Sequence, residues 1–199
     1  MSQPGDLFGA PPPEPQPAPD GLRYQPALLD PAEQASLVAD LETLPFAPFE
    51  FQGWLGARRI VSFGLSYDFT RERLDPAEPL PDFLHPLRDR AAAFAGLAPG
   101  ALAQTLINEY RPGAGIGWHR DRPHYDKVIG VSLGAPCVMR LRQKDGEGWR
   151  RRKLPLAPGS VYLLDGPARR DWEHSITPLE ALRYSVTFRT LREGTPFRA

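Results

Sequence analysis

Short β-rich runs separated by Gly, Pro and Asp fill the second half of the chain, and they constrain its fold more than any other feature. Eight such runs of four to nine residues follow Pro99. Many short strands at this spacing are typical of antiparallel double-sheet folds, namely barrels and jelly rolls. The predicted strands are 104–110, 116–119, 128–133, 136–142, 149–156, 160–164, 173–176 and 182–190.

Two helices are predicted before these strands. Asp30, Pro31 and Glu33 form a capping box with Pro at the first helical position, and an apolar stripe then predicts a helix over 31–44. A second helix is predicted over 81–95, with Pro86 near its start. Residues 46–69 lie between them and favour a hairpin, with its clearest strand at 58–63. The fold class is therefore α+β and mainly β, a double-stranded β-helix (jelly roll) core with N-terminal buttressing helices and a hairpin.

The 199 residues suit one domain with a substantial core. The first 20 residues contain seven prolines and too little apolar surface to order, so 1–20 is predicted to be a disordered Pro-rich segment. The domain then spans 21–199, with the helices and hairpin in 21–100 and the jelly-roll core in 101–199. No internal repeat or second domain boundary is evident.

Cellular location is predicted from what the sequence lacks. The start of the chain does not have the charged-then-apolar pattern of a secretory signal. Cys137 is the single cysteine, which excludes an internal disulfide and fits a reducing compartment. No apolar stretch approaches the roughly 20 residues that cross a bilayer. We expect a soluble, cytoplasmic protein with no membrane association and no obligate protein partner.

The formal net charge is zero, yet residues 140–153 carry seven basic side chains against two acidic ones. A basic patch on a neutral protein can bind phosphates. A solvated hairpin tip explains the same run, so both interpretations stay open.

His119 and Asp121 are two residues apart, so on an extended strand their side chains leave the same face. His174 lies in a later β-rich run. Two imidazoles and one carboxylate on one face of a metal leave coordination positions open, as suits ferrous iron that handles dioxygen. The His-x-Asp pattern alone is weak evidence of a metal site, because a His–Asp hydrogen bond or a surface pair would also explain it.

The last predicted strand adds a second part of the same site. Its apolar side chains alternate with polar ones, and a face with two guanidinium groups and two hydroxyls is unusual unless it lines a polar cavity. An arginine there would bind the distal carboxylate of a keto acid, and Asn108 and Tyr110, which also share a face, would orient that acid. The apolar residues are Tyr184, Val186 and Phe188, and the polar ones are Arg183, Ser185, Thr187 and Arg189.

The motifs NEYRPGAGIGWHRD, DWEHSI and RYSVTFR together resemble the AlkB-like family of iron(II)- and 2-oxoglutarate-dependent dioxygenases, over about residues 104–191. The resemblance implies Fe(II), 2-oxoglutarate and O2 as cofactor and co-substrates. It implies that the iron ligands are His119, Asp121 and His174. The implied 2-oxoglutarate contacts are Asn108, Tyr110, Arg183 and Arg189, with Arg183 on the distal carboxylate.

Members of this family typically oxidise N-methyl groups on nucleobases, with release of succinate, CO2 and formaldehyde. The resemblance therefore implies an alkylated nucleic acid, DNA or RNA, as substrate, with a flipped base held near the metal. By position the hairpin over 46–69 resembles the family's nucleotide-recognition lid. Its candidate substrate residues are Trp54, Phe63 and Tyr67 for stacking and Arg58 and Arg59 for phosphate contact, although core packing more often explains each aromatic taken singly.

The sequence departs from the family after Asp121, where Arg122-Pro123-His124-Tyr125 lacks the acidic residue that some DNA-repair members carry. The choice of base stays open for that reason. Two alternatives remain: the same oxygenase chemistry on a protein, lipid or small molecule, and a non-enzymatic binding module.

Overall fold

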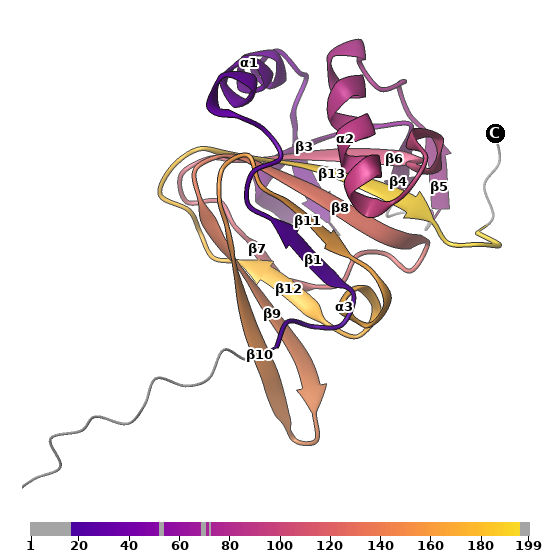
Figure 1. Cartoon of the computed structure of the whole chain (residues 1–199), viewed down its shortest axis with the longest axis vertical. Coiled ribbons are helices and arrows are strands. Elements are labelled where there is room, and N and C mark those ends of the chain that lie inside the picture. The colour runs from indigo at the N-terminus through magenta and orange to yellow at the C-terminus, as the bar shows by residue number, and fades with distance from the viewer. Residues whose placement is uncertain (1–16, 52–53, 69–70, 72, 196–199) are drawn as a thin grey trace, which may run out of the picture.

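The computed structural model describes residues 17–51, 54–68, 71 and 73–195, with the backbone alone at 50, 51, 54 and 55. Its strands form two antiparallel sheets that face each other, with a small separate hairpin (Figure 1). The described strands of the larger sheet follow the order β1-β11-β8-β13-β6-β3-β2, and those of the smaller follow β10-β9-β12-β7. This is the predicted jelly roll. The expected disordered segment 1–20 falls mostly outside the described residues.

All eight predicted strands are present, and their ends differ from the prediction by at most three residues. The larger sheet contains β1 (Leu22–Gln25), β2 (Ala47–Phe51), β3 (Trp54–Phe63), β6 (Gln104–Tyr110), β8 (Tyr125–Gly134), β11 (Val161–Leu164) and β13 (Arg183–Leu191). The smaller sheet contains β7 (Ile116–His119), β9 (Cys137–Asp145), β10 (Gly148–Leu156) and β12 (Glu173–Ile176). The prediction missed β1, β5 (Arg73–Pro76) and a short helix, α3 (Gly166–Arg170), because none of them has enough residues to show a periodicity.

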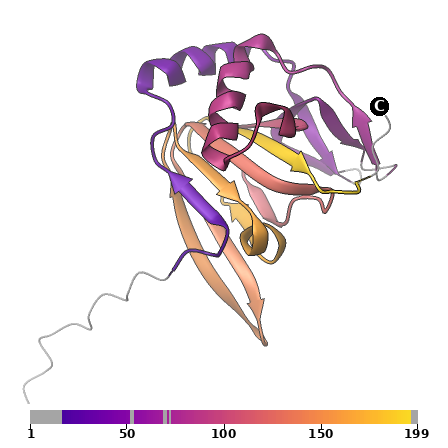
Figure 2. The same ribbon diagram turned by 45° about the vertical axis from the view of Figure 1, so that its right-hand side comes forward.

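The predicted helices cover the outer face of the larger sheet (Figures 1 and 2). Helix α1 (Pro31–Glu42) begins with the predicted capping box. The short 3-10 helix η1 (Asp82–Leu84) leads into α2 (His85–Ala95), so Pro86 lies in the first turn, where a missing N–H costs nothing. Their apolar stripes pack on Val186, Phe188 and their neighbours to form the main core.

A second core lies between the two sheets and includes Met139, Leu141 and Trp172. Cys137 is buried here as a small hydrophobic side chain, and burial raises the pKa of its thiol. No helix within the described part of the chain is long and apolar enough to cross a membrane.

The segment predicted as a hairpin over 46–69 joins the edge of the larger sheet. Strand β2 pairs with β3, and β3 in turn pairs with β6. Strands β4 (Leu65–Asp68) and β5 (Arg73–Pro76) form the separate hairpin. Because β3 is hydrogen-bonded to β6, its side chains on one face are held over the strand that carries Asn108 and Tyr110.

Candidate metal centre and keto-acid site

The jelly roll brings the three predicted iron ligands together. Strands β7 and β12 pair antiparallel, with His119 directly opposite His174, and the two ring centroids are 4.2 Å apart. Strand β7 ends at His119, so Asp121 lies just beyond it rather than on it. The Asp121 Oδ2 atom is still only 3.7 Å from His174 Nε2. At ordinary ligand distances of about 2.1 Å, these two atoms can reach one ion.

A buried arginine holds the carboxylate of this trio. Arg189 donates to Asp121 Oδ1 from both Nε and Nη2, and both side chains are less than 10% exposed. Burial would raise the pKa of Asp121, but the charge of Arg189 and the imidazoles of His174 and His119 lower it well below its usual range. The carboxylate is therefore ionised at any physiological pH, with Oδ2 directed to the histidines.

The two imidazoles are in the form that metal binding needs. His119 Nδ1 lies 2.9 Å from the carbonyl oxygen of Gly117. A carbonyl can only accept, so Nδ1 carries the proton and Nε2 keeps a lone pair for an ion. Burial, with the neighbouring His119, lowers the pKa of His174 to about 3, so this ring is neutral.

Within the described residues, no three His, Cys, Asp or Glu side chains already surround a point as a finished metal site. His119, Asp121 and His174 lie beside one another, and one oxygen of the Asp121 carboxylate accepts from Arg189. Its donor set and protonation states nevertheless fit Fe(II), which takes imidazole and carboxylate ligands and leaves positions open.

Arg183 has the environment predicted for a carboxylate partner. It is fully buried, its Nε donates to Ser132 Oγ at 3.1 Å, and its Nη1 is buried without a hydrogen-bond partner. Its guanidinium lies 5.2 Å from the Tyr110 ring. An unpartnered buried N–H of a cation is costly, so this atom is available to an anionic group.

The register between β13 and β6 explains why the two motifs form one site. Arg183 lies opposite Tyr110, Ser185 opposite Asn108, and Arg189 opposite Gln104. Ser185, Thr187 and Arg189 of β13 therefore line the cavity, while Tyr184, Val186 and Phe188 face the helices, as predicted. The two arginines lie at opposite ends of β13. Arg189 is at the metal end, where its Nη1 also donates to Gln104 Oε1, and Arg183 is near Tyr110.

A cavity of about 930 Å³ extends from this site between the sheets. The ligand trio, Asn108 and Tyr110 line it, and so do several more arginines. These are Arg58, Arg120, Arg122, Arg169, Arg170 and Arg192. Only Asp121 and Glu173 contribute negative charge to the described lining, so the cavity favours an anionic occupant.

The predicted substrate residues do not share one location. Tyr67 lines the cavity, with the Arg122 guanidinium 4.8 Å from its ring centroid. Arg58 also points into it, where it stacks 3.8 Å from the centre of the Phe49 ring and donates to Asn108 Oδ1. The side chain of Trp54 lies outside the described residues.

Arg59 and Phe63 face the other side of β3. Arg59 pairs with Glu109 at 2.9 Å and donates to the Phe46 carbonyl, so it braces the sheet. Phe63 is buried in the main core. These two residues therefore do not line the cavity, because side chains alternate along a strand and the cavity face of β3 carries Arg58 and its i+2 neighbours.

Sequence reasoning missed three polar residues of the site: Gln104, Ser132 and Arg169. Gln104 and Ser132 hold the two arginines of β13. Arg169, on α3, donates to the carbonyls of Arg122 and Tyr125 and so fixes the turn that follows Asp121. No local motif indicates these three residues. Cross-strand register positions Gln104 and Ser132, and helix α3 positions Arg169.

The chain is similar in sequence to known proteins. The model of the 2OG-Fe(II) oxygenase superfamily matches residues 21–189. An Arabidopsis thaliana protein described as an alkylated DNA repair protein ALKBH8 homolog is 27% identical and covers 78% of this chain and 50% of the relative. The alpha-ketoglutarate-dependent dioxygenase AlkB of Escherichia coli is 33% identical over 57% of each chain. The chain thus spans about half the length of these relatives.

Solved structures show the same fold. The structure described as OsALKBH1 superposes with a TM-score of 0.69, at 17% identity, over 88% of this chain and 99% of that one. A 2OG-Fe(II) family oxidoreductase from Burkholderia pseudomallei gives a TM-score of 0.62 at 19% identity, over 90% and 89% of the two chains. With a family model that matches most of its length and a fold and polar site of this kind, the chain belongs to the 2OG-Fe(II) oxygenase superfamily and is an AlkB-like member of it.

Proposed function

We propose that this protein is an Fe(II)- and 2-oxoglutarate-dependent dioxygenase that removes N-alkyl groups from bases in DNA or RNA, with release of succinate, CO2 and formaldehyde. One observation carries the proposal: two neutral imidazoles and an ionised carboxylate meet at one end of a cavity, and a buried arginine with an unpartnered nitrogen lies 5.2 Å from the ring of Tyr110, which lines the same cavity. Bound iron would supply the activation of dioxygen, coupled to oxidative decarboxylation of the keto acid.

The chain's own residues have separable roles in this proposal. His119, Asp121 and His174 would hold the iron. Arg183 would pair with the distal carboxylate of 2-oxoglutarate, and Asn108 and Tyr110 would orient the same molecule. Arg189, whose N–H groups are directed at Asp121 and Gln104, would position the carboxylate ligand.

The substrate class is supported by the size and lining of the cavity. About 930 Å³ is enough for a keto acid and a nucleoside together. Phe49 and Tyr67 offer aromatic faces for a planar base, and the exposed arginines of the lining, Arg120, Arg170 and Arg192, suit phosphates. Relatives with names such as DNA oxidative demethylase ALKBH2 of Mus musculus, 32% identical over 64% of this chain, agree with this class.

The test is incubation of the full chain with Fe(II), 2-oxoglutarate and ascorbate on oligonucleotides that carry N-methylated bases. We expect formaldehyde, succinate and the restored base in equal amounts. If succinate release were stimulated by a peptide, lipid or metabolite and by no nucleic acid, the chemistry would stand and the substrate class would be wrong. If neither iron nor 2-oxoglutarate bound, the oxygenase proposal itself would fail.

A further inference from the structure

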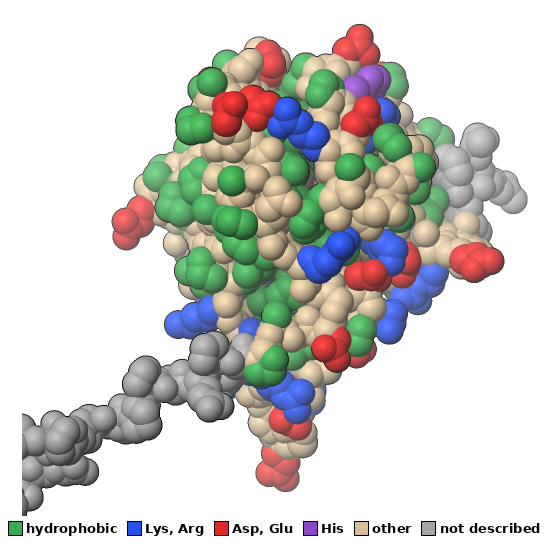
Figure 3. Space-filling view, viewed as in Figure 1, with side chains coloured by type: hydrophobic (Ala, Val, Ile, Leu, Met, Phe, Trp, Pro, Cys, Tyr) green, Lys and Arg blue, Asp and Glu red, His purple; other side chains and the backbone are tan. Residues whose placement is uncertain are grey.

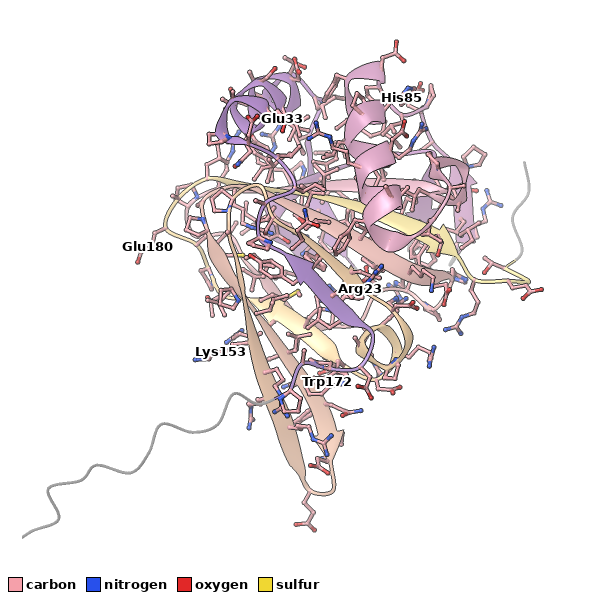
Figure 4. All side chains as sticks on the ribbon, viewed as in Figure 1. Arg23, Glu33, His85, Lys153, Trp172 and Glu180 are labelled. Carbon is pink, nitrogen blue, oxygen red and sulfur yellow. The ribbon has the colours of Figure 1, made fainter. Side chains whose placement is uncertain are left out.

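The outer face of the smaller sheet carries cations interleaved with two tryptophans. Strands β9 and β10 alternate between an inner face, with Met139 and Leu141 in the core, and an outer face of polar and aromatic side chains. Figure 4 shows Lys153 on one side of the β9–β10 hairpin and Trp172 on the other. The outer face also carries Val138 and Pro155. Its polar and aromatic members, called the Arg–Trp face below, are Trp118, Arg140, Arg142, Lys144, Trp149, Arg151, Lys153, Glu173 and Ser175.

These side chains form a continuous series of cation–aromatic contacts. The Trp118 ring lies 5.0 Å from the Arg140 guanidinium and 4.4 Å from that of Arg142. Arg142 also lies 4.0 Å from the Trp149 ring, which Lys144 approaches to 5.3 Å. The indoles are thus held with the cations around them, half-buried and in fixed orientation.

The pattern of charge on this face is unfavourable for the sheet itself. Arg142 lies directly opposite Arg151, and Arg140 lies opposite Lys153. Like charges in direct cross-strand pairs destabilise a sheet. Glu173, 2.6 Å from Arg142, is the one acid among the described residues of the Arg–Trp face. Arg140, for its part, donates to Ser175. Two unfavourable pairs with one compensating carboxylate indicate a polyanionic partner.

The Arg–Trp face begins at the active site. Trp118 immediately precedes the ligand His119 and contributes to the cavity lining. The face of the molecule seen in Figure 3, which includes the helices and β1, mixes both signs of charge without a continuous patch. The Arg–Trp face therefore differs from it in both charge pattern and aromatic content.

We propose that the Arg–Trp face binds the nucleic-acid strand that flanks the substrate base, with phosphates on its cations and an unpaired base stacked on Trp149. The proposal rests on the proposed function for its substrate class. Single-stranded nucleic acid is bound elsewhere by this combination of a basic track and aromatic platforms, and every base has a face that can stack. A partner protein would not need stacking platforms set between like-charged pairs.

The test measures binding of a fluorescent, unmodified single-stranded oligonucleotide to the full chain loaded with Fe(II) and 2-oxoglutarate without oxygen. The double variant R151E/K153E changes two exposed cations of the face. We expect at least 10-fold weaker binding and a log–log salt dependence that is shallower by about 1.4, or about 0.7 per lost phosphate contact. Trp149→Ala should weaken binding about 5- to 150-fold, the range for loss of one stacked base.

The matched control is R23E/R88E, which changes the net charge equally on the helix side of the molecule, at exposed Arg23 on β1 and at Arg88 on α2. It should bind almost as the unaltered protein does. If the control lost as much affinity as R151E/K153E, the effect would be one of net charge and the proposal would be wrong. It would also be wrong if the unaltered protein bound no oligonucleotide. Should Trp149→Ala fail to fold, R151E/K153E decides alone, since its side chains are exposed.

Activity separates this proposal from the proposed function. A methylated mononucleotide has no flanking strand to contact Arg151 and Lys153, so the unaltered protein and R151E/K153E should turn it over equally. A methylated 15-mer should be turned over more slowly by R151E/K153E than by the unaltered protein. Turnover of methylated 15-mers with unchanged binding in both face variants would retain the function and overturn the interface. Loss of binding in those variants, with no turnover of any nucleic acid, would retain the interface and overturn the function.

Discussion

Arg189 donates two hydrogen bonds to the same oxygen of Asp121, from Nε at 3.1 Å and from Nη2 at 2.7 Å. The second carboxylate oxygen is left facing His174. A predicted iron ligand is thus also one half of a buried ion pair between the last strand and the turn after β7. Substitution of Asp121 should therefore lower the stability of the fold as well as remove an iron ligand.

Asp121→Ala should abolish turnover and also unfold more easily, because it leaves the Arg189 guanidinium buried without its carboxylate. We expect a loss of about 3 kcal/mol, which lowers Tm by about 6–12 °C in a chain of this size. His119→Ala should abolish turnover with little change in Tm, and Asp121→Asn, which keeps an acceptor, should lie between them. Thermal unfolding and succinate assays on the three variants check this. Equal Tm values for all three would contradict the buried pair.

Arg183→Met should selectively weaken the binding of 2-oxoglutarate. Each hydrogen bond to a charged partner contributes about 1.5–3 kcal/mol, so loss of one raises the KM for 2-oxoglutarate about 10- to 150-fold. The KM for the oligonucleotide should change little, because Arg183 is fully buried away from the mouth. Steady-state kinetics with each substrate varied in turn measures both constants. An unchanged KM for 2-oxoglutarate would move this role to another residue.

Arg58 and Arg59 are adjacent in sequence but should behave oppositely. Arg58 lies in the cavity against Phe49, and burial lowers the pKa of its guanidinium. Arg58→Met should therefore raise the KM for the modified oligonucleotide severalfold. Arg59→Met instead removes an ion pair from Glu109, a side chain only 7% exposed, and should lower the stability by about 1–3 kcal/mol with substrate KM unchanged. Urea unfolding and kinetics on the pair distinguish the two faces of β3, and a reversed result would contradict the β3 register.

The Lys127–Asp165 pair should give a pH-dependent contribution to stability. Burial raises the pKa of Asp165, but hydrogen bonds from Lys127 Nζ and the Gly166 N–H outweigh this, so the pKa is lowered overall. A lowered carboxyl pKa stabilises the fold above the unfolded value of about 3.9, and that contribution disappears as pH falls through the lower folded value. Both side chains are about 30% exposed, which limits the contribution to about 0.5–1 kcal/mol at pH 7.

The corresponding measurement is urea unfolding of the unaltered protein and Lys127→Met at pH 7 and at pH 3. The difference in unfolding free energy should be present at pH 7 and smaller at pH 3. A difference that is independent of pH would show that Lys127 acts through packing of its aliphatic chain.

The sequence alone determined the strands, the capped first helix and the residue types of the site. Alternation of apolar and polar residues fixes which side chains share a face, so the polar face of β13 and the core positions of Val186 and Phe188 were predictable. The Asp30 capping box is equally local, since all its hydrogen bonds lie within one helical turn.

Only the tertiary structure decided how those faces are used. Alternation separates Arg58 from Arg59 but cannot say which of them faces the cavity; the pairing of β3 with β6 does. The Arg189–Asp121 pair joins residues 68 positions apart, and the contact of Trp118 with Arg142 depends on the strand order β9-β12-β7 of the smaller sheet. For that reason the chemistry of the metal site could be predicted from the sequence. The position of the Asp121 carboxylate, the unpartnered Nη1 of Arg183 and the Arg–Trp face could not.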